Sequence, residues 1–414
     1  DGYEAGGSTP LMVIADDWAS PGQFDWTIPL DGTIPADAEY LIEVQSQDGT
    51  KPSGLSASFS IARVGNEYFV NDGSQIGDVF TTAAGDNQNS GKAVDQPMAS
   101  LAALLRVYDL EPGDTVLIDA GHYSLLENLR LDERLSGITL RGPGGDSAVL
   151  DRQLTENDAY AFEFVGADDV TIQGLSITGA QRGVNAEWNS GSQRIHLIDN
   201  EIYDNSWIGI SIGYNHANTG ITGWLLEGNR IHANSGNGGI LADGSEVEIV
   251  GNEVFGNSAG ITAGSPHVRI QGNRVYDNVG TGVYSSKAMV SENEVFGNAT
   301  GIFISDATVT ENSVYQNIDG IVIGEQYSDS RYHPENIVRG NRVFANEGAG
   351  IIFRRDGHVT GNYVYSNSVG ILSDDNHFEG EIANNLVYAN TNQGIVIQDS
   401  DKGATVLNNT VYQR

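Results

Sequence analysis

The densest mixture of aromatic, acidic and basic residues in the sequence lies between residues 325 and 377. Cleavage or epimerisation of a uronate sugar needs one group that neutralises the carboxylate at C5 and another that takes the C5 proton. Arg354 and Arg355 are candidates for the first role, and His333 and Lys287 for the second. The other expected substrate contacts in this stretch are Tyr327, Arg331, Tyr332 and His377.

A column of ionisable residues is expected five positions after the glycine that opens each sequence repeat. Asp375 and Glu325 are its candidate catalytic carboxylates. Carboxyls one repeat apart would lie near the roughly 5 Å of retaining glycosidases, and carboxyls two repeats apart approach the roughly 6.5–9.5 Å of inverting ones. Two alternatives to lyase or epimerase chemistry therefore remain open. One is hydrolysis, and the other is a column of solvent-exposed charges that only compensate one another. The column reads Trp188, Tyr214, Gly244, Ser265, Lys287, Asp306, Glu325, Arg355, Asp375 and Asp399.

Two further features extend the candidate site. Asp-rich turns at Asp306, Asp374 and Asp399 suggest a Ca²⁺ cofactor, because Ca²⁺ prefers carboxylate and carbonyl oxygens. Trp188 and Tyr214 provide a second substrate-binding region, at the first of the two longest repeats. Insertions on a rigid scaffold often carry binding sites.

These residues are positioned by a repeat that begins near residue 200. The unit Asn-x-(Val/Ile)-aromatic-x-Asn recurs every 19 to 24 residues, with two units of 29. Short β-branched runs between Asn and Gly turns are typical of one coil of a parallel β-solenoid. The asparagines predict internal amide ladders, and the aromatic residues predict a stack of rings. The first Asn falls at Asn200, Asn229, Asn252, Asn273, Asn293, Asn312, Asn341, Asn362, Asn385 and Asn409, and the second falls five residues later until Arg414 breaks that series.

The chain upstream of the repeat divides into two parts. Apolar residues at helical spacing predict a helix over about 97–110 that caps the open end of the solenoid. Residues 1–63 contain runs that alternate apolar and polar side chains, as in an antiparallel sheet with one buried face. The expected organisation is a partial β-sandwich of immunoglobulin or fibronectin type at 1–63. An all-β, right-handed parallel β-helix follows at 64–414.

Composition excludes several classes of protein. The 414 residues carry a net charge of -34 and no cysteine. A disulfide framework and a thiol nucleophile are therefore absent, and the charge opposes binding to nucleic acid or anionic membranes. Without a run of 18 apolar residues, no membrane insertion is expected. A start at Asp1 suggests a fragment of a longer chain.

Two residues after the opening glycine, strand alternation predicts an apolar strip on the outside of the solenoid. Such a strip is unusual for a free surface. Three covers are expected alternatives: the inserted loop near residue 330, a neighbouring domain or subunit, or an apolar glycan surface. The strip comprises Tyr284, Phe303, Val322, Ile352, Leu372 and Val396.

Several short stretches resemble the N-terminal cap of secreted right-handed parallel β-helix proteins. They are Tyr68-Phe-Val-Asn-Asp-Gly, Pro112-Gly-Asp-Thr-Val, Ala120-Gly-His-Tyr and Ile138-Thr-Leu-Arg-Gly. The coils are similar to those of β-helix polysaccharide lyases and mannuronan C5-epimerases, although the Tyr-Gly-x-Asp-Pro-His motif of the epimerases is absent. The resemblance implies an extracellular protein with a polysaccharide partner and lyase or epimerase action on a uronate-containing chain. A glycoside hydrolase and a non-catalytic glycan-binding or adhesive module are the alternatives.

Overall fold

The computed structural model describes residues 2–4, 14, 39–44, 54–56, 59–60, 66–213, 220–324, 336–354, 356–374, 380–398 and 403–413. By its internal contacts the chain divides into two compact units, Asp1–Asn66 and Glu67–Arg414. Among the described residues, no helix is long and apolar enough to cross a membrane.

The first unit contains a small antiparallel sheet. Its strands are β1 (Gly2–Glu4), β2 (Glu39–Val44), β3 (Gly54–Leu55) and β4 (Phe59–Ser60), and β2 pairs with each of the other three. Tyr40 on β2 is buried at 3% exposure. The partial sandwich at 1–63 remains a prediction.

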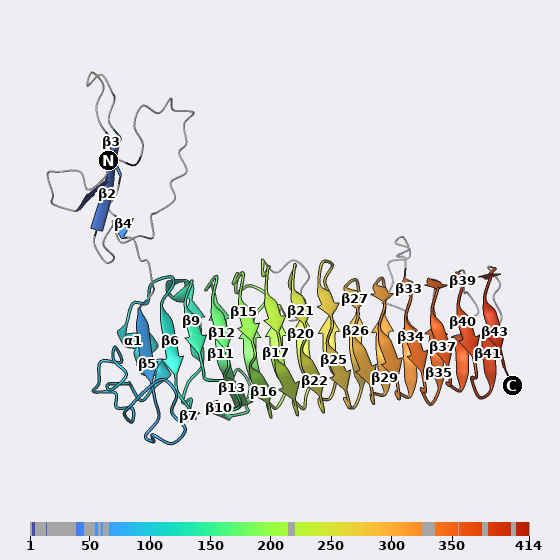
Figure 1. Cartoon of the computed structure of the whole chain (residues 1–414), viewed down its shortest axis with the longest axis horizontal. Helices are drawn as coiled ribbons and strands as arrows, with labels where there is room; N and C mark the ends of the chain where they lie inside the picture. The colour runs from blue at the N-terminus through green and yellow to red at the C-terminus, as the bar shows by residue number, and fades with distance from the viewer. Residues whose placement is uncertain are drawn as a thin grey trace. The chain divides into compact units, whose positions relative to one another are not determined.

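The second unit is a right-handed parallel β-helix, as the sequence predicts, with coils stacked along one axis (Figure 1). Each complete coil passes through three parallel sheets, which we call sheets 1, 2 and 3 in the order in which the chain enters them. Sheet 1 contains β5 (Glu67–Val70), β6 (Thr115–Ile118), β9 (Thr139–Arg141), β12 (Thr171–Gln173), β15 (His196–Ile198), β18 (Leu225–Glu227), β21 (Glu248–Val250), β24 (Arg269–Gln271), β27 (Met289–Ser291), β30 (Thr308–Thr310), β33 (Ile337–Arg339), β36 (His358–Thr360), β39 (Glu381–Ala383) and β42 (Thr405–Leu407).

Sheets 2 and 3 follow the same order along the axis. Sheet 2 contains β7 (Gly121–Ser124), β10 (Ala148–Leu154), β13 (Ser176–Ala180), β16 (Glu201–Tyr203), β19 (Arg230–His232), β22 (Glu253–Phe255), β25 (Arg274–Tyr276), β28 (Glu294–Phe296), β31 (Ser313–Tyr315), β34 (Arg342–Phe344), β37 (Tyr363–Tyr365), β40 (Leu386–Tyr388) and β43 (Thr410–Tyr412). Sheet 3 contains β8 (Leu129–Asp132), β11 (Tyr160–Val165), β14 (Arg182–Ala186), β17 (Ile208–Ile212), β20 (Gly238–Ala242), β23 (Ile261–Ala263), β26 (Thr281–Ser285), β29 (Thr300–Ile304), β32 (Asp319–Ile323), β35 (Ala349–Phe353), β38 (Val369–Ser373) and β41 (Gln393–Ile397).

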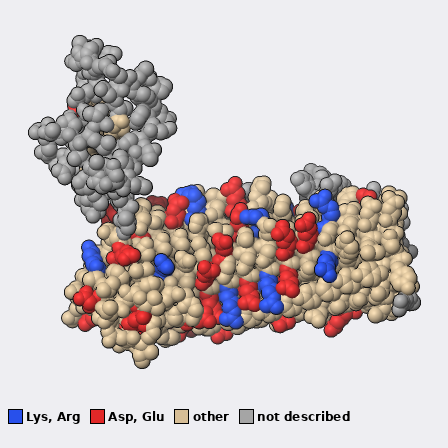
Figure 2. All heavy atoms as spheres, viewed as in Figure 1, with Lys and Arg blue, Asp and Glu red and all other residues tan. Residues whose placement is uncertain are grey.

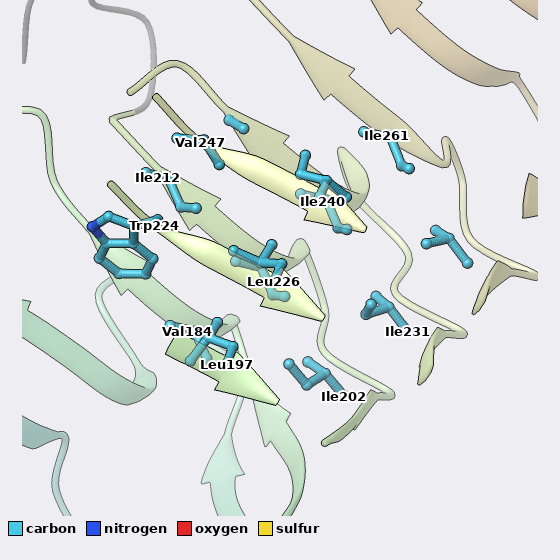
Figure 3. Close-up of a cluster of buried hydrophobic side chains, with 14 of the residues drawn as sticks. Val184, Leu197, Ile202, Ile212, Trp224, Leu226, Ile231, Ile240, Val247 and Ile261 are labelled. Atoms are coloured by element: carbon cyan, nitrogen blue, oxygen red, sulfur yellow. The ribbon is translucent and has the colours of Figure 1, made fainter. Parts of the chain in front are cut away.

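Aliphatic side chains from all three sheets form the core. The middle residue of a three-residue strand points inward, as Leu226 on β18 and Ile231 on β19 do, and both are fully buried. Figure 3 shows these side chains and Ile240 of sheet 3 directed toward a common interior. Stacking identical positions at about 4.8 Å per coil buries each aliphatic residue against its equivalents above and below.

The predicted cap helix is present but shorter than expected. Helix α1 spans Leu101–Val107, and the Ser100 side chain accepts a hydrogen bond from the Ala103 backbone N–H at 3.3 Å. It begins later than residue 97 because the backbone N–H of Met98 donates to Phe69 on β5 at 2.9 Å. Leu101 and Leu104 pack into the core beside the first coils, as the capping role requires.

Two asparagine ladders run inside the corners on either side of sheet 2, as predicted. Asn273 shows the pattern: its Nδ2 donates to Asn293 Oδ1 at 3.0 Å and to the carbonyl of Ile249 at 2.8 Å, and its Oδ1 accepts from the backbone N–H of Asn252 at 2.9 Å. Arg414 breaks the second series of asparagines, and Gln413 takes the next place in that ladder: its Oε1 accepts from the backbone N–H of Asn390 at 3.1 Å.

The predicted ring stack lies on the outer face of sheet 2. From Tyr203 to Tyr388, neighbouring rings stand 4.8–5.3 Å apart and within 17° of parallel. The ring faces therefore cover one another, and mainly their edges reach solvent. Because a sugar packs on the face of an aromatic ring, this stack is a structural element rather than a row of sugar platforms.

Charges beside the ring stack compensate one another. Glu201, Arg230, Glu253, Arg274 and Glu294 occupy one register position on successive coils, and neighbouring members form ion pairs of 2.6–3.4 Å. Figure 2 shows acidic and basic side chains interspersed along the middle coils. Ion pairs near the surface add little stability each. With three glutamates against two arginines, the column offers no surplus positive charge to an anionic ligand.

Tyr315 links the ring stack to this charged column, and it makes stability depend on alkaline pH. Burial, followed by the 2.6 Å hydrogen bond from its hydroxyl to Glu294, raises the pKa of Tyr315 to about 12, above the ordinary value of about 10. Its contribution to stability is therefore complete below about pH 10 and is lost as the pH rises toward about 12. We expect the melting temperature to fall across this window, and to fall less in Tyr315→Phe; equal falls in thermal melts of both proteins would contradict this assignment.

The predicted outward strip forms a single column on sheet 3. Backbone pairing aligns Tyr284, Phe303, Val322, Ile352, Leu372 and Val396 on successive coils. The middle of the strip is not an open surface, since Val322 and Ile352 are only 2% and 4% exposed and cluster with Ala349. The Tyr284 and Phe303 rings stack 5.5 Å apart.

Candidate functional site

One residue of each coil stands two positions before the sheet 1 strand, at the corner where the chain leaves sheet 3. On four successive coils this residue is Glu246, His267, Lys287 or Asp306, and we call the four the corner column. The strands that follow them are paired in register, so the four residues occupy equivalent positions. Neighbouring members are therefore about one coil, or 4.8 Å, apart along the axis.

The four residues of the corner column share an uncommon backbone conformation. All four residues have positive φ, from 53° at Glu246 to 122° at Lys287, a conformation that residues with a side chain adopt uncommonly. Glu246, His267 and Lys287 are exposed and Asp306 is half-buried. The corner thus displays an acid, two basic groups and a second acid in succession.

A pocket opens beside the first members of this column. Its volume is about 580 Å³, within the usual range for ligand sites. In the coil before Glu246 the equivalent position is Gly223, which has no side chain to fill the space. The pocket, which we call the sheet 1 pocket, is lined by His196, Gly223, Trp224, Leu225, Glu246, Glu248, His267 and Arg269.

Hydrogen bonds fix the charged groups of the sheet 1 pocket. The Arg269 guanidinium donates to Glu248 on the preceding coil and to Gln271 on its own strand. Glu246 Oε2 accepts from the Thr222 hydroxyl at 2.9 Å. Arg269 is therefore held as an oriented cation, next to an imidazole and an amine on successive corners. Removal of a proton next to a substrate carboxylate needs a cation that pairs with the carboxylate and groups that accept and donate protons. Arg269 is the cation here, and His267, Lys287 and the glutamates are the groups for proton transfer.

Part of the predicted site lies in this region. Lys287 and Asp306 are members of the corner column. Trp188 is 46% exposed but stands four coils before Lys287, so the structure does not bring these two together. Arg354 is exposed, and its Nε lies 4.0 Å from Asp374 Oδ2. The remaining candidates lie outside the described residues: Tyr214, Glu325, Tyr327, Arg331, Tyr332, His333, Arg355, Asp375, His377 and Asp399.

Counting five residues from the opening glycine identifies a member of the corner column only where the corner between sheets 3 and 1 is short. Lys287 follows its glycine by five residues, but His267 follows Gly260 by seven, so Ser265 is not its equivalent. The corner between sheets 3 and 1 varies in length, whereas the path from there to the first asparagine ladder is constant. Counting six residues back from Asn252 or Asn273 would have identified Glu246 and His267.

The carboxylates predicted to bind Ca²⁺ do not form one centre. Asp306 follows β29 and Asp374 follows β38, three coils along the axis, so they are about 14 Å apart in that direction. In the part of the chain that the structure describes, no group of three or more His, Asp or Glu residues could hold a metal ion. Calcium binding through separate turns remains a prediction.

Several solved structures are similar to this chain. The A-module of the Azotobacter vinelandii mannuronan C-5 epimerase AlgE6 has a TM-score of 0.50 at 14% identity, covering 84% of this chain and 89% of that chain. The GH136 lacto-N-biosidase of Eubacterium ramulus has a TM-score of 0.49 at 16% identity, covering 84% of this chain and 68% of that chain. The periplasmic alginate epimerase AlgG gives 0.47 at 16% identity, with 76% and 84% covered. At these identities the likeness concerns the fold alone.

Family models give a broader assignment. The comparison with curated proteins gave no match. A model described as "Right handed beta helix region" matches residues 305–411, and one described as "Periplasmic copper-binding protein (NosD)" matches residues 112–299 and 216–332. Copper favours imidazole and sulfur ligands; the chain has no cysteine, and its described residues contain no metal-binding cluster, so they do not fit a copper centre. Because the second model spans more than half of the sequence, the chain belongs to the family described as periplasmic copper-binding protein (NosD).

Proposed function

We propose that the protein acts on a uronate-containing polysaccharide, by lyase or epimerase chemistry, at the corner column and the sheet 1 pocket. The observation that carries this proposal is the arrangement of His267 and Lys287 on adjacent corners beside the fixed guanidinium of Arg269. The likeness of the fold to mannuronan and alginate epimerases supports the substrate class.

Each group has a defined role in this reaction. The Arg269 side chain is 39% exposed, so it can exchange Glu248 for the sugar carboxylate, whereas the buried Arg182 cannot turn from its partner. Its charge then stabilises the negative charge that develops when the C5–H bond breaks. Lys287 takes the C5 proton. In the lyase reaction a C4=C5 double bond forms, the C4–O bond breaks, and the Lys287 ammonium formed by taking the C5 proton gives a proton to the departing oxygen. In the epimerase reaction a proton returns to C5 from the opposite face.

The overall charge limits how the polymer binds. A net charge of -34 repels a polyanion, so salt should strengthen the encounter by screening rather than weaken it. Ca²⁺ would act in the same direction if it bridged sugar carboxylates to Asp306, Asp374 or Asp399. We therefore include calcium as a proposed cofactor, with a polysaccharide as partner. A secreted or periplasmic location accords with this substrate.

The function is tested by incubation with acidic and neutral polysaccharides, with either Ca²⁺ or a chelator. Ultraviolet absorbance reports unsaturated uronate, and a reducing-end assay reports chain cleavage. We expect absorbance with new ends for a lyase, or neither signal but a changed C5 configuration by NMR for an epimerase. New ends without absorbance would contradict the proposal and show a hydrolase.

A non-catalytic glycan-binding or adhesive module is the second candidate. It is favoured by the self-compensating outer face of sheet 2, where Glu–Arg pairs and stacked rings build a stiff and regular surface. Glycan binding with no product in any of the three assays would establish this alternative.

A further inference from the structure

A second pocket lies at a different corner of the solenoid, where the chain passes from sheet 2 to sheet 3. Its volume is about 520 Å³. We propose that this pocket binds a neutral sugar unit of a glycan, separately from the proposed reaction site, with which it shares no lining residue. We call it the Arg182 pocket, and it is lined by Asn157, Asp158, Gln181, Arg182, Ser206 and Trp207.

A buried arginine gives this pocket a rigid wall. The Arg182 side chain is only 8% exposed although Arg182 is the first residue of strand β14, next to the corner between sheets 2 and 3. Its Nη1 donates to Asn185 Oδ1 at 2.5 Å and to Glu187 Oε1 at 2.7 Å. The guanidinium carbon lies 4.4 Å from the centre of the Trp207 ring and 5.4 Å from that of Tyr160. Glu187 balances the charge, and the two rings hold the guanidinium in place.

The tryptophan is fixed from the neighbouring coil. A side chain at Gly236 would place its Cβ 2.1 Å from Trp207 Cδ1 and 2.6 Å from Trp207 Cα, so only glycine fits there. Trp207 is thus held between Arg182 and the next coil, yet it remains half-buried and borders the pocket. A rigid, partly exposed indole gives an apolar contact for the C–H groups of a sugar ring.

The polar lining is ordered by its own hydrogen bonds. Gln181 Nε2 donates to Asn157 Oδ1 at 2.9 Å, and Gln181 Oε1 accepts from the backbone N–H of Asp158 at 3.1 Å. Asp158 Oδ1 accepts from the Tyr160 hydroxyl at 2.9 Å, and the Ser206 hydroxyl donates to the carbonyl of Thr155 at 2.9 Å. Carboxylate and amide groups have capacity for further hydrogen bonds, so this lining offers both donors and acceptors in fixed places.

The residues that line the Arg182 pocket favour a ligand with hydroxyl groups over an anionic ligand. The one cation of the lining, Arg182, is already paired with Glu187, and the one other charged group, Asp158, is acidic. A uronate would bring its carboxylate toward Asp158 without meeting an uncompensated positive charge. A neutral hexose instead presents paired hydroxyls, which suit a carboxylate and side-chain amides, and apolar C–H groups, which suit the indole.

The test is calorimetric titration of the whole protein with neutral tetrasaccharides of glucose, mannose and galactose, and with a tetrauronate. We expect at least one neutral tetrasaccharide to bind, with at least tenfold weaker affinity in Trp207→Ala and in the isosteric variant Asp158→Asn. Tyr363→Ala is the matched control, because Tyr363 is a 50% exposed ring outside both pockets and should leave affinity unchanged.

Thermal melts of each variant separate loss of binding from loss of folding, and Asp158→Asn keeps the test valid if Trp207→Ala unfolds. Absence of binding by all three neutral tetrasaccharides, or equal affinity in wild type and both pocket variants, would overturn the proposal. Preference of this pocket for the tetrauronate would overturn it as well. Because the titration needs no turnover, its result is independent of the reaction proposed at the sheet 1 pocket.

Discussion

Replacing Lys287 with alanine should lower the rate of reaction on a uronate polymer by about 10²–10⁴-fold, the range that general-base catalysis supplies. The folded structure should be unaffected, since Lys287 is an exposed corner residue outside the core. The measurement is initial rate, by absorbance or NMR, together with a thermal melt of each protein.

Arg339→Ala is the matched control for Lys287→Ala. Arg339 is also an exposed cation of the solenoid, on strand β33 of sheet 1, but it lies outside the sheet 1 pocket and the corner column. Its removal should leave the rate within about twofold of wild type. A Lys287→Ala protein as active as the Arg339→Ala protein would show that the corner column does not supply the base.

Asn298→Ala should lower the free energy of unfolding by about 3–5 kcal/mol, because several buried groups would lose partners at about 1–3 kcal/mol each. The Asn298 amide donates to the carbonyl of Phe296 at 2.9 Å and to Asn317 Oδ1 at 3.0 Å. Its Oδ1 accepts from the backbone N–H of Asn278 at 3.1 Å. Denaturant unfolding followed by circular dichroism measures the change.

Asn392 provides the control for the ladder. Its side chain forms an exposed hydrogen bond to Ser368 at 2.7 Å, at the surface of the same solenoid. Asn392→Ala should change stability by less than about 0.5 kcal/mol, as surface substitutions usually do. If both variants unfold at the same denaturant concentration, the amide ladders are not the stabilising element proposed here.

The repeat makes the fold readable from sequence. Because the asparagines and the aromatic rings recur at a fixed spacing, one periodic arrangement fits them. In it, equivalent residues of successive coils stack on one another. The ladders through Asn273 and the rings from Tyr203 to Tyr388 follow directly. Whether the rings lie inside or outside needs the strand alternation as well; the middle residue of each sheet 2 strand points inward, so the rings lie on the outside.

The candidate site is harder to read because its geometry depends on the one corner whose length varies. Alignment on the opening glycine brings Lys287 and Asp306 together but misplaces His267 and Glu246, whose corners are two residues longer. The Arg182 pocket has a different reason for being missed. Four of its lining residues precede the regular asparagine repeat, so no periodic signal marks their position: Asn157, Asp158, Gln181 and Arg182.

Removal of the C5 proton is the step shared by the lyase and the epimerase, so the most direct test follows that proton. A uronate polymer is incubated with the protein in deuterium oxide, and its C5 position is observed by NMR. The account predicts either deuterium incorporation at C5 or unsaturated chain ends with wild-type protein, and a loss of at least 100-fold in rate with Lys287→Ala. An unchanged C5 proton signal across acidic polymers, with Ca²⁺ present and absent, would contradict the central claim.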